Sequence, residues 1–297
     1  MSKPALLTTA TLAAATLAAS SLVAPAAARA EAGKLTTTVF TASPTGFLVD
    51  STLVAGDKDA ILIDAQFDLA DAHRLVAMLL ESKKNLTTVY ITHGHPDHYF
   101  GLALIHDAFP AAKLVALPST VAEIQKTWQA KLKQWGPMYG NLLPAKPVLP
   151  TALTGTTLTL EGQTLELHGP AQGDDAGNSY VWIPSIKTAI VGDIVYRGVH
   201  AWTAETKPAQ RAAWKKTLAE LAALGPTTVI AGHKDPKQPD DAAGLDATRA
   251  YLDAFDAAVA SSKTAAEVVS KVKAKFPDAQ LDVILQLGAG AAFPAAK

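Results

Sequence analysis

The chain has 297 residues, of which 49% are hydrophobic, and its formal net charge is −1. This length is enough for one large domain or two small ones, and the apolar fraction is enough for a sizeable core. The near-neutral charge, without a basic stripe, argues against a nucleic-acid partner. The absence of cysteine excludes disulfides, thiolate metal ligands and a cysteine nucleophile.

The first thirty residues have the composition of a secretory signal peptide. Lys3 precedes an uncharged run rich in Ala, Leu and Thr from Pro4 to Ala28, and Ala28-Arg29-Ala30 is a small-x-small cleavage motif. An uncleaved membrane anchor is the alternative, since the run is long enough to span a bilayer, but its many Ala, Thr and Ser residues make it weakly hydrophobic. We therefore expect residues 1–30 to be a signal peptide and residues 31–297 to be one periplasmic or secreted domain without stable membrane insertion.

Strands and helices are predicted in succession along the first half of the mature chain. Short apolar runs, alternating or continuous, predict strands over residues 35–41, 46–55, 60–64, 87–91 and 113–117. Helical spacing of apolar residues predicts helices over residues 69–81, 99–108 and 119–133. Residues 127–150 place Trp128, Trp135 and Tyr139 among lysines and prolines. We interpret this segment either as a loop packed over the core or as an aromatic lid over an apolar substrate pocket.

The second half repeats the same kind of succession. A hairpin with Glu161-Gly162 at its turn is predicted over residues 156–168, and further strands over residues 179–183, 186–191 and 227–230. Helices are predicted over residues 209–224, 242–261 and 265–275. This order predicts an α/β fold, a four-layer αββα sandwich with two sheets face to face.

The densest group of metal-ligand side chains follows the predicted strand 87–91. His93, His95, Asp97 and His98 occur within six residues, in His93-Gly94-His95-Pro96-Asp97-His98. A strand that runs into a loop with Gly and Pro places them at its C-terminal end, where open α/β sheets usually have their sites. Neutral imidazole and carboxylate are ligands for zinc and related metals. Because His-x-His and Asp-His point in two directions, we predict that this loop serves two adjacent metals.

Two further strand ends supply candidates for the remaining ligands. Two metals about 3.5–4 Å apart need about three protein ligands each and a shared bridge. Asp193 follows Val191-Gly192, and His233 follows Ala231-Gly232, each at the end of an apolar strand. Either residue alone is typical of a turn. Together with the first motif, they predict that Asp193 bridges the two metals and that His233 completes one site.

These three motifs resemble those of the metallo-β-lactamase-fold metallohydrolases in order and context. The resemblance extends over about residues 35–260, and it implies the αββα fold and hydrolysis by a hydroxide at a dinuclear metal centre. It also implies that His93 and His95 hold one metal, that Asp97, His98 and His233 hold the other, and that Asp193 bridges them. Asp97 is further implied as a catalytic residue that orients the nucleophile and passes a proton to the leaving group. Zinc is the expected metal, with manganese or iron as alternatives.

One position departs from the family pattern. Members usually carry a histidine ligand in a Gly-His-Thr-Pro-Gly turn, and the matching segment here is Gly173-Asp174-Asp175-Ala176-Gly177. Asp174 therefore stands where the histidine is expected. A carboxylate is a competent but harder ligand, and it favours manganese or iron. Asp174 is the predicted ligand; a replacement by His168, Gln172 or Asp175, or a single-metal site, is the alternative.

The predicted function is that of an exported metal-dependent hydrolase that cleaves a small ester, a lactone or a similar small molecule. A metallo-β-lactamase is one alternative, although β-lactamases of this fold generally lack the bridging aspartate and use cysteine or serine near the second metal. A degenerate metal-binding module without catalysis is the other, suggested by Asp174. The candidate substrate contacts are Tyr99, Trp135, Tyr139, His200 and Trp202. For His200, a contact near the metals and a structural loop role are the alternatives.

Overall fold

The computed structural model describes residues 1–2 and 33–293. The predicted signal peptide therefore lies almost entirely outside the described residues. The residues from 33 onward fall in one compact unit. No described helix combines the length and the apolar character needed to cross a membrane.

The first sheet contains six strands that follow one another in sequence order. They are β1 (Thr36–Thr41), β2 (Asp50–Ala55), β3 (Asp59–Ile63), β4 (Asn85–Ile91), β5 (Lys113–Ala116) and β6 (Thr151–Ala152). The first three pair antiparallel, whereas β3 to β6 run parallel. β3 is buried along almost its whole length, as the continuous apolar run Ile61-Leu62-Ile63 predicts for a strand covered on both faces.

The second sheet has five strands in the order β12-β10-β9-β8-β7. They are β7 (Thr157–Leu160), β8 (Gln163–Ala171), β9 (Asn178–Ile183), β10 (Thr188–Ile190) and β12 (Thr228–Ile230). All neighbours pair antiparallel except β10 and β12, which are parallel. Two short strands, β11 (Tyr196–Arg197) and β13 (His233–Lys234), pair separately and in parallel. The predicted turn at Glu161-Gly162 is confirmed, because both residues have positive φ between β7 and β8.

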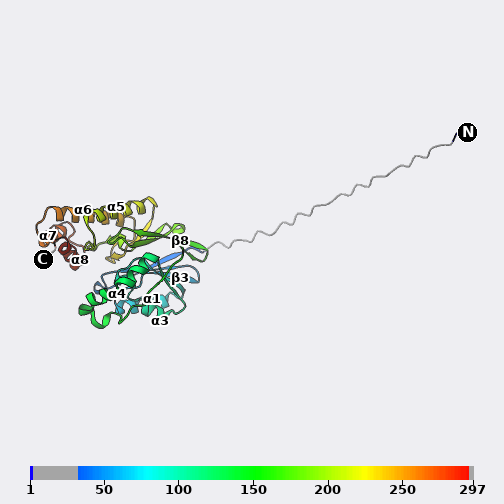
Figure 1. Cartoon of the computed structure of the whole chain (residues 1–297), viewed down its shortest axis with the longest axis horizontal. Coiled ribbons are helices and arrows are strands. Elements are labelled where there is room, and N and C mark those ends of the chain that lie inside the picture. Colours follow the sequence, from blue (N-terminus) through cyan, green and yellow to red (C-terminus); the bar gives the residue numbers. More distant parts are fainter. Residues whose placement is uncertain (3–32, 294–297) are drawn as a thin grey trace. The chain divides into compact units, whose positions relative to one another are not determined.

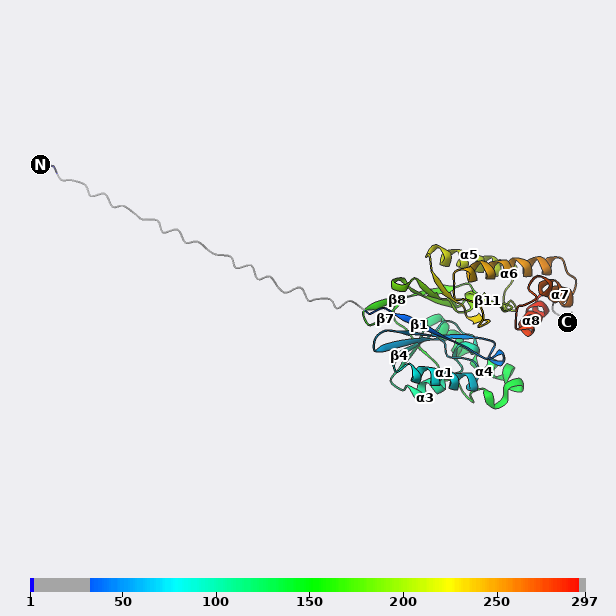
Figure 2. The ribbon, with the colours of Figure 1, turned by 180° about the vertical axis from the view of Figure 1, so that it is seen from behind.

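The two sheets pack face to face, and helices cover their outer faces (Figure 1). Ile61 and Ile63 of β3 meet Val181 and Ile183 of β9 in the layer between the sheets. The helices outside the first sheet are α1 (Leu69–Glu81), α2 (Pro96–Tyr99), α3 (Leu102–Ala108) and α4 (Pro118–Tyr139). Outside the second sheet lie α5 (Pro208–Ala223) and α6 (Ala243–Ala260), while α7 (Ala265–Lys275) and α8 (Asp282–Ala292) lie at one end of the sandwich, as the reverse view also shows (Figure 2). The predicted αββα sandwich is confirmed.

The helix α4 is longer than the sequence predicted. The prediction ended the helix near Lys133, and the structure continues it through Pro137 to Tyr139. Trp128, Leu132, Trp135 and Tyr139 share one face at helical spacing and pack against the core under the first sheet. This apolar stripe outweighs the helix-ending signal of Gly136-Pro137, since a proline in the last turn removes only one hydrogen bond. The predicted helix end near Lys133 is therefore wrong, and of the two interpretations of residues 127–150 the loop is wrong as far as Tyr139.

Two other predicted elements differ from the structure, and both differences lie near the predicted ligands. The predicted strand 46–55 starts only at Asp50, because Pro44–Gly46 form a 3-10 helix and Phe47 and Leu48 have φ of 61° and 53°. The predicted helix 99–108 is split at Gly101 into α2 and α3. A Cβ at Gly101 would lie 1.9 Å from the carbonyl oxygen of Ala65, so only glycine permits this close approach.

Candidate metal centre

The seven predicted ligands come from four separate segments that meet where strands of both sheets end. The loop after β4 carries His93 and His95, and α2 carries Asp97 and His98. The 3-10 helix η4 (Gly192–Ile194) follows β10 and carries Asp193, while His233 begins β13 directly after β12. Asp174 lies in the loop between β8 and β9. The segments belong to both sheets, so the fold assembles the ligands from across the sandwich.

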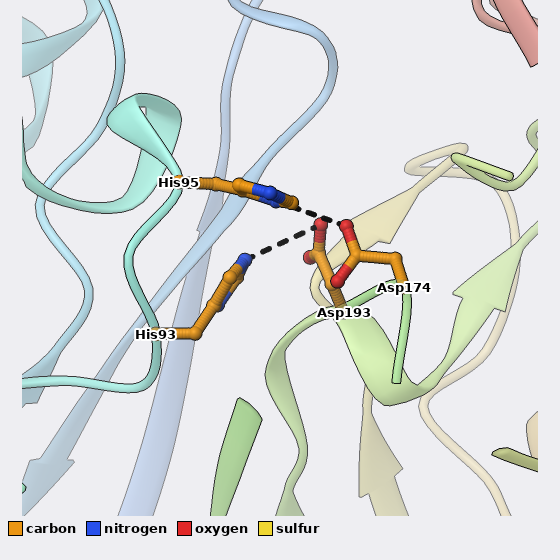
Figure 3. A group of neighbouring side chains, drawn as sticks. All are labelled: His93, His95, Asp174 and Asp193. Carbon is orange, nitrogen blue, oxygen red and sulfur yellow. Dashed lines mark ion pairs between the residues drawn. The ribbon is translucent and has the colours of Figure 1, made fainter. Parts of the chain in front are cut away.

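His93, His95, Asp174 and Asp193 form the first group of ligands, called the His93 group here (Figure 3). Their ligand atoms all lie within 4.8 Å of one another, and all four residues are buried. His95 Nδ1 is 3.0 Å from Asp174 Oδ2, and His93 Nε2 is 3.7 Å from Asp193 Oδ2. The group thus presents two imidazoles from one side to two carboxylates on the other.

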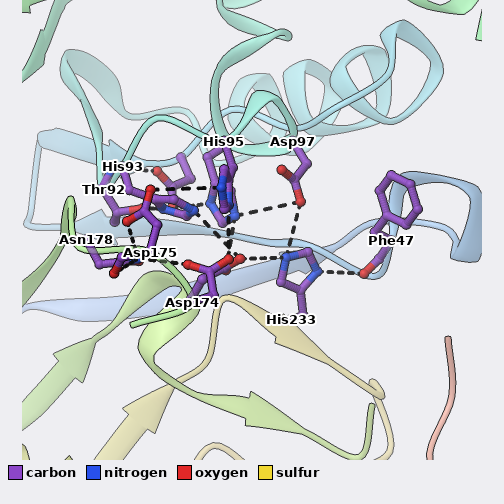
Figure 4. Close-up of polar contacts among 12 residues, drawn as sticks. Phe47, Thr92, His93, His95, Asp97, Asp174, Asp175, Asn178 and His233 are labelled. Atoms are coloured by element: carbon purple, nitrogen blue, oxygen red, sulfur yellow. Dashed lines mark hydrogen bonds and ion pairs between the residues drawn. The ribbon is translucent and has the colours of Figure 1, made fainter. Parts of the chain in front are cut away.

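Asp97, His98 and His233 form the second group, called the Asp97 group here, again with ligand atoms within 4.8 Å of one another. His233 Nε2 is 3.2 Å from Asp97 Oδ2 (Figure 4). Asp193 also reaches this group: its Oδ1 is 3.1 Å from His98 Nε2, and its Oδ2 is 3.2 Å from His233 Nε2. Asp193 therefore faces imidazoles of both groups, in the place that a bridging ligand requires.

Gly232 allows Asp193 to take this place. A Cβ at Gly232 would lie 2.1 Å from Asp193 Oδ1 and 2.5 Å from the backbone of Gly192. Any side chain at position 232 would displace the carboxylate or the turn that carries it. This explains in physical terms why glycine precedes the histidine in the motif Gly232-His233.

Each of the four histidines has a hydrogen-bond partner for the ring nitrogen that points away from the centre. His98 Nδ1 donates to Asp64 Oδ2 at 2.8 Å, and His233 Nδ1 donates to the carbonyl oxygen of Phe47 at 2.7 Å. The positive φ of Phe47, which lies before the start of β2, aims this carbonyl at the ring. Such partners fix the tautomer and leave the other nitrogen free to bind a metal.

The two histidines of the His93 group have partners of a different kind. Thr92 Oγ1 donates to Asp64 at 2.8 Å, so it accepts from His93 Nδ1 at 3.0 Å. His95 Nε2 donates to Glu205 Oε2 at 3.3 Å, across the centre from a loop of the second half. Glu205 in turn pairs with Lys131 of α4 at 3.2 Å, and its side chain is 41% exposed. The partner of His95 is thus the one that lies near solvent.

Several ligand atoms are buried without a good hydrogen bond. This is the state expected of atoms that bind a cation. Among the described residues, His93 Nε2, His98 Nε2 and Asp193 Oδ1 make no hydrogen bond of good geometry, although the last two lie 3.1 Å from each other. A buried polar atom without a partner costs about 1–3 kcal/mol, so three of them in one place indicate a site for a ligand. A divalent cation would satisfy all three. The donor set, imidazoles and carboxylates, suits zinc, manganese or iron.

The buried carboxylates of the centre favour positive charge beside them. Burial would raise the pKa of Asp193, but His233 and His98 beside it hold that pKa well below its usual range. Burial would lower the pKa of His233, but Asp193 outweighs it and raises that pKa to about 10. At Asp174, by contrast, burial dominates over His95 and raises the pKa to about 7. This carboxylate needs further positive charge nearby to stay ionised.

Asp174 occupies the position predicted for the replaced histidine ligand. Its Oδ1 accepts from Asn178 Nδ2 at 2.8 Å, and its Oδ2 accepts from the hydroxyl of Tyr196 at 3.2 Å. The same hydroxyl lies closer to Asp193 Oδ2, at 2.7 Å, so its single proton is shared between the two carboxylates. Of the alternatives, His168 stacks on Tyr180 outside both groups. Asp175 lies 3.9 Å from His95 Nε2, on the far side of that ring.

A pocket opens directly beside the ligands. Trp135, His200 and Trp202, three of the predicted substrate contacts, line it together with His95, Asp97, Asp174, Asp193 and His233. Tyr99 and Tyr139 do not line it: Tyr99 is fully buried in the core, and the Tyr139 hydroxyl donates to the carbonyl oxygen of Thr45. The Nδ1 of His200 is 3.2 Å from the hydroxyl of Tyr251, so this ring also has a structural contact.

The sequence did not point to several residues of this site. They are Phe47, Asp64, Lys131, Tyr196 and Glu205. Asp64 ends the predicted strand 60–64, and a carboxylate at a strand end is a signal that would have found it. Glu205 and Lys131 carried no such signal, because they lie in a loop and on a helix face without any motif.

The comparisons with known proteins agree with this geometry. The family model of the metallo-beta-lactamase superfamily matches residues 44–233, more than half of the chain, and the chain belongs to this superfamily. The resemblance inferred from the motifs is thereby confirmed. Membership and the His/Asp groups together indicate a protein that binds divalent metal, in a superfamily of metal-dependent hydrolases.

Solved structures show the same fold at low sequence identity. A metallo-beta-lactamase family protein from Thermus thermophilus is 20% identical, with a TM-score of 0.61 over 86% of this chain and 91% of that chain. A metallo-beta-lactamase from Pontibacter korlensis is 20% identical, with a TM-score of 0.55 over 74% and 94%. The DIM-1 metallo-beta-lactamase is 21% identical, with a TM-score of 0.54 over 75% and 99%. No curated protein matches the chain.

Proposed function

We propose that this protein is an exported hydrolase that uses two divalent metals to cleave a carboxylic ester, a lactone or a similar uncharged electrophile. The observation that carries this proposal is the position of Asp193. Its two oxygens lie 3.1 Å from His98 Nε2 and 3.2 Å from His233 Nε2, and it also faces His93. A carboxylate shared in this way by two ligand groups is the arrangement that a two-metal hydrolase needs.

Each group of ligands is assigned one metal. One metal would be held by His93, His95 and Asp174, and the other by Asp97, His98 and His233. Asp193 would be a ligand of both. When bound, such metals lower the pKa of a coordinated water to about 7 and polarise the electrophilic oxygen of the substrate. Asp97 is the proposed catalytic residue, because it lines the pocket and its side chain is 14% exposed. Burial would raise its pKa, but His98 and His233 hold it well below the usual range, so Asp97 is ionised, as a metal ligand must be.

The charge of the loaded centre favours an uncharged substrate. Three carboxylate ligands, Asp97, Asp174 and Asp193, and two divalent ions leave one net positive charge, where a histidine at position 174 would leave two. Glu205 and Lys131 at the rim neutralise each other. A weaker positive field attracts anions such as phosphate esters less strongly than the usual family centre does.

A hydrolysis panel tests this proposal. Protein reconstituted separately with zinc, manganese and iron is given aryl esters, lactones, thioesters, phosphodiesters, sulfate esters and nitrocefin. We expect metal-dependent turnover of esters or lactones, and none by the variant His95→Ala with unchanged far-UV circular dichroism. Preferred cleavage of nitrocefin would instead favour a β-lactamase, and full activity of metal-free protein would refute the proposal.

A second candidate function is a metal-binding module without catalysis. The presence of Asp174 in place of a histidine ligand is the observation that favours it. The buried carboxyl of Asp174 has a pKa raised to about 7 by burial, so it is a weaker ligand at low pH than the other carboxylates. Two tightly held metal equivalents together with turnover support the enzyme. One equivalent or none, with no turnover across the panel, supports the module.

Export is part of the proposal and rests on the sequence of residues 1–30. Expression in a Gram-negative host, followed by N-terminal sequencing of the periplasmic fraction, is the direct test. We expect a mature N-terminus at Glu31. Retention of Met1 in the cytoplasmic fraction would contradict export without affecting the proposed chemistry.

A further inference from the structure

The pocket beside the metal centre has one apolar side, and this side belongs to α4 and α8. Trp135 of α4 and Ile284 of α8 both line it, joined by Phe47, Trp202 and Leu281. All five also belong to the apolar cluster under the first sheet or pack against it. The C-terminal part of α4 and the helix α8 lie at the same end of the molecule in both ribbon views (Figures 1 and 2). The apolar side of the pocket is therefore built by the two halves of the chain together.

The same two elements, with the turn directly after α4, carry most of the exposed large apolar side chains. In residues 33–293 these are Leu80, Met138, Leu142, Val283 and Leu287. Met138 is 72% exposed and lies three residues after Trp135, and Leu287 is 43% exposed and lies three residues after Ile284. Residues three apart are neighbours on a helix surface. Each helix thus extends an apolar stripe from the pocket to the outside, and of these five residues only Leu80 lies elsewhere.

From this arrangement we infer that the substrate carries a linear acyl chain, which leaves the metal centre between α4 and α8 and covers the exposed residues of these elements. The inference rests on the proposed hydrolase function and names its substrate class: uncharged esters or lactones of medium- to long-chain fatty acids. Two features select this occupant over a membrane surface or a second copy of the chain. The apolar residues are continuous with the pocket, and the one lysine that lines the pocket, Lys131, is paired with Glu205.

The reaction is an ordinary hydrolysis. Water adds its oxygen to the acyl carbon, the bond from that carbon to the ester oxygen breaks, and the ester oxygen leaves with a proton. The products are a fatty acid and an alcohol, or a hydroxy acid from a lactone. The acyl chain of the substrate takes no part in these bond changes. It therefore affects substrate binding and the second-order rate constant kcat/KM rather than the chemical step.

A chain-length series tests the inference. The metal-reconstituted protein is given p-nitrophenyl acetate, butyrate, octanoate and dodecanoate below their micellar concentrations. We expect kcat/KM to rise by about fourfold for each methylene that contacts the protein. In the double variant Met138→Gln/Leu287→Gln we expect the gain from octanoate to dodecanoate to disappear. Leu80→Gln removes an equally exposed apolar side chain elsewhere and is expected to keep the full chain-length dependence.

A binding measurement separates this inference from the hydrolase function. The neutral amide ω-bromoundecanamide quenches tryptophan fluorescence on contact, and it is titrated into the protein with and without metal. We expect saturable quenching in both states, weakened at least fivefold by Met138→Gln/Leu287→Gln. Ester hydrolysis without chain-length dependence and without saturable quenching would overturn the inference and leave the hydrolase function intact. Saturable quenching without any hydrolysis would leave the acyl site intact and refute the function.

The other occupants of this surface give distinct results. If the exposed residues form an interface between two copies, sedimentation shows a dimer that the double variant converts to a monomer, with a flat chain-length series. If they contact a membrane, the protein sediments with neutral phosphatidylcholine vesicles and the double variant does not, again with a flat series. Either result would overturn the inference. A monomer that stays in solution and shows the rising series supports it.

Discussion

The two ligand groups of the centre have nearly the same donors but different surroundings. With Asp174 in place of histidine, each group offers two imidazoles and one carboxylate of its own, and both share Asp193. In the Asp97 group, the ring nitrogens that face outward are held by Asp64 and by the carbonyl oxygen of Phe47, both deep in the fold. In the His93 group, His95 is held by Glu205, which is 41% exposed and reaches across the pocket.

This comparison indicates that metal affinity in the two groups is set by the outer partners rather than by the ligands. A ligand that is held in place before the metal arrives loses less entropy on binding. The Asp97 group is therefore expected to bind its metal more tightly, and the His93 group to be the one that loses metal first.

The variant Asp193→Asn is expected to have the largest effect, because Asp193 is the one residue of the seven ligands that faces both groups. Loss of its charge should weaken both metals by more than about 100-fold and abolish turnover. Native mass spectrometry after dialysis measures the loss, with near-UV circular dichroism as the control for folding. An Asp193→Asn protein that keeps both metals would show that the two groups do not share this carboxylate.

The variant Asp174→Asn is expected to remove one metal only. Asn178 and Tyr196 also contact this carboxyl, so the amide retains part of the hydrogen bonding and the fold should persist. We expect the metal content to fall by about one equivalent, with the Asp97 group still loaded. Cobalt substitution and visible spectroscopy report which group remains. Loss of both metals, or of neither, would contradict the division into two groups.

The variant Glu205→Ala removes the outer hydrogen-bond partner of His95. Removing this partner of His95 should weaken the more labile metal by about 10–100-fold without affecting the tighter one or the melting temperature. Asp64→Ala is the comparison variant for a buried outer partner. Asp64 holds His98 directly and His93 through Thr92, so this variant should weaken both metals. It should also lower stability by about 1–3 kcal/mol, since Asp64 accepts from the N–H of buried Thr92. Chelator competition and thermal unfolding separate the two cases.

The pH dependence of metal binding is expected to be a smaller effect that involves both groups. Burial lowers the pKa of His95, His98 and His233, but the facing carboxylates outweigh it and raise all three. His233, with a pKa of about 10, is then protonated in the metal-free protein at neutral pH and must release its proton to bind metal, and the raised pKa values of His95 and His98 act in the same direction. Metal affinity should therefore fall by about tenfold or more for each pH unit lost between about pH 9 and pH 6. Calorimetry in buffers of different ionisation enthalpy counts the protons, and an affinity that does not change with pH would contradict the ion-pair geometry.

The sequence was sufficient to predict the fold and the groups of ligands, because both depend on local signals. Strand periodicity placed the motifs at strand ends, and the parallel pairs β3–β4 and β10–β12 bring such ends to one edge. Asp193 and His233 were predicted together for this reason, although 40 residues separate them. The replacement at Asp174 was visible because Gly173 and Gly177 fix the alignment of the segment.

The sequence was insufficient where contacts across the molecule decide the outcome. The length of α4 depends on Trp135 and Tyr139 packing against the core, which outweighs the local signal of Pro137. The helix α8 was not predicted, and neither was its part in the pocket. The contact between Glu205 and His95 joins a loop to a residue 110 positions away, and no local pattern specifies such a partner.

The metal content of the wild-type protein, measured together with its activity, tests whether the two-metal centre exists. Protein purified without chelator is exchanged into volatile buffer and examined by native mass spectrometry, while the same sample is assayed with an aryl ester. We predict two divalent ions per chain and loss of turnover as the first ion is removed. A protein that holds one ion or none, or that keeps its full activity after both are removed, would contradict the two-metal centre around Asp193.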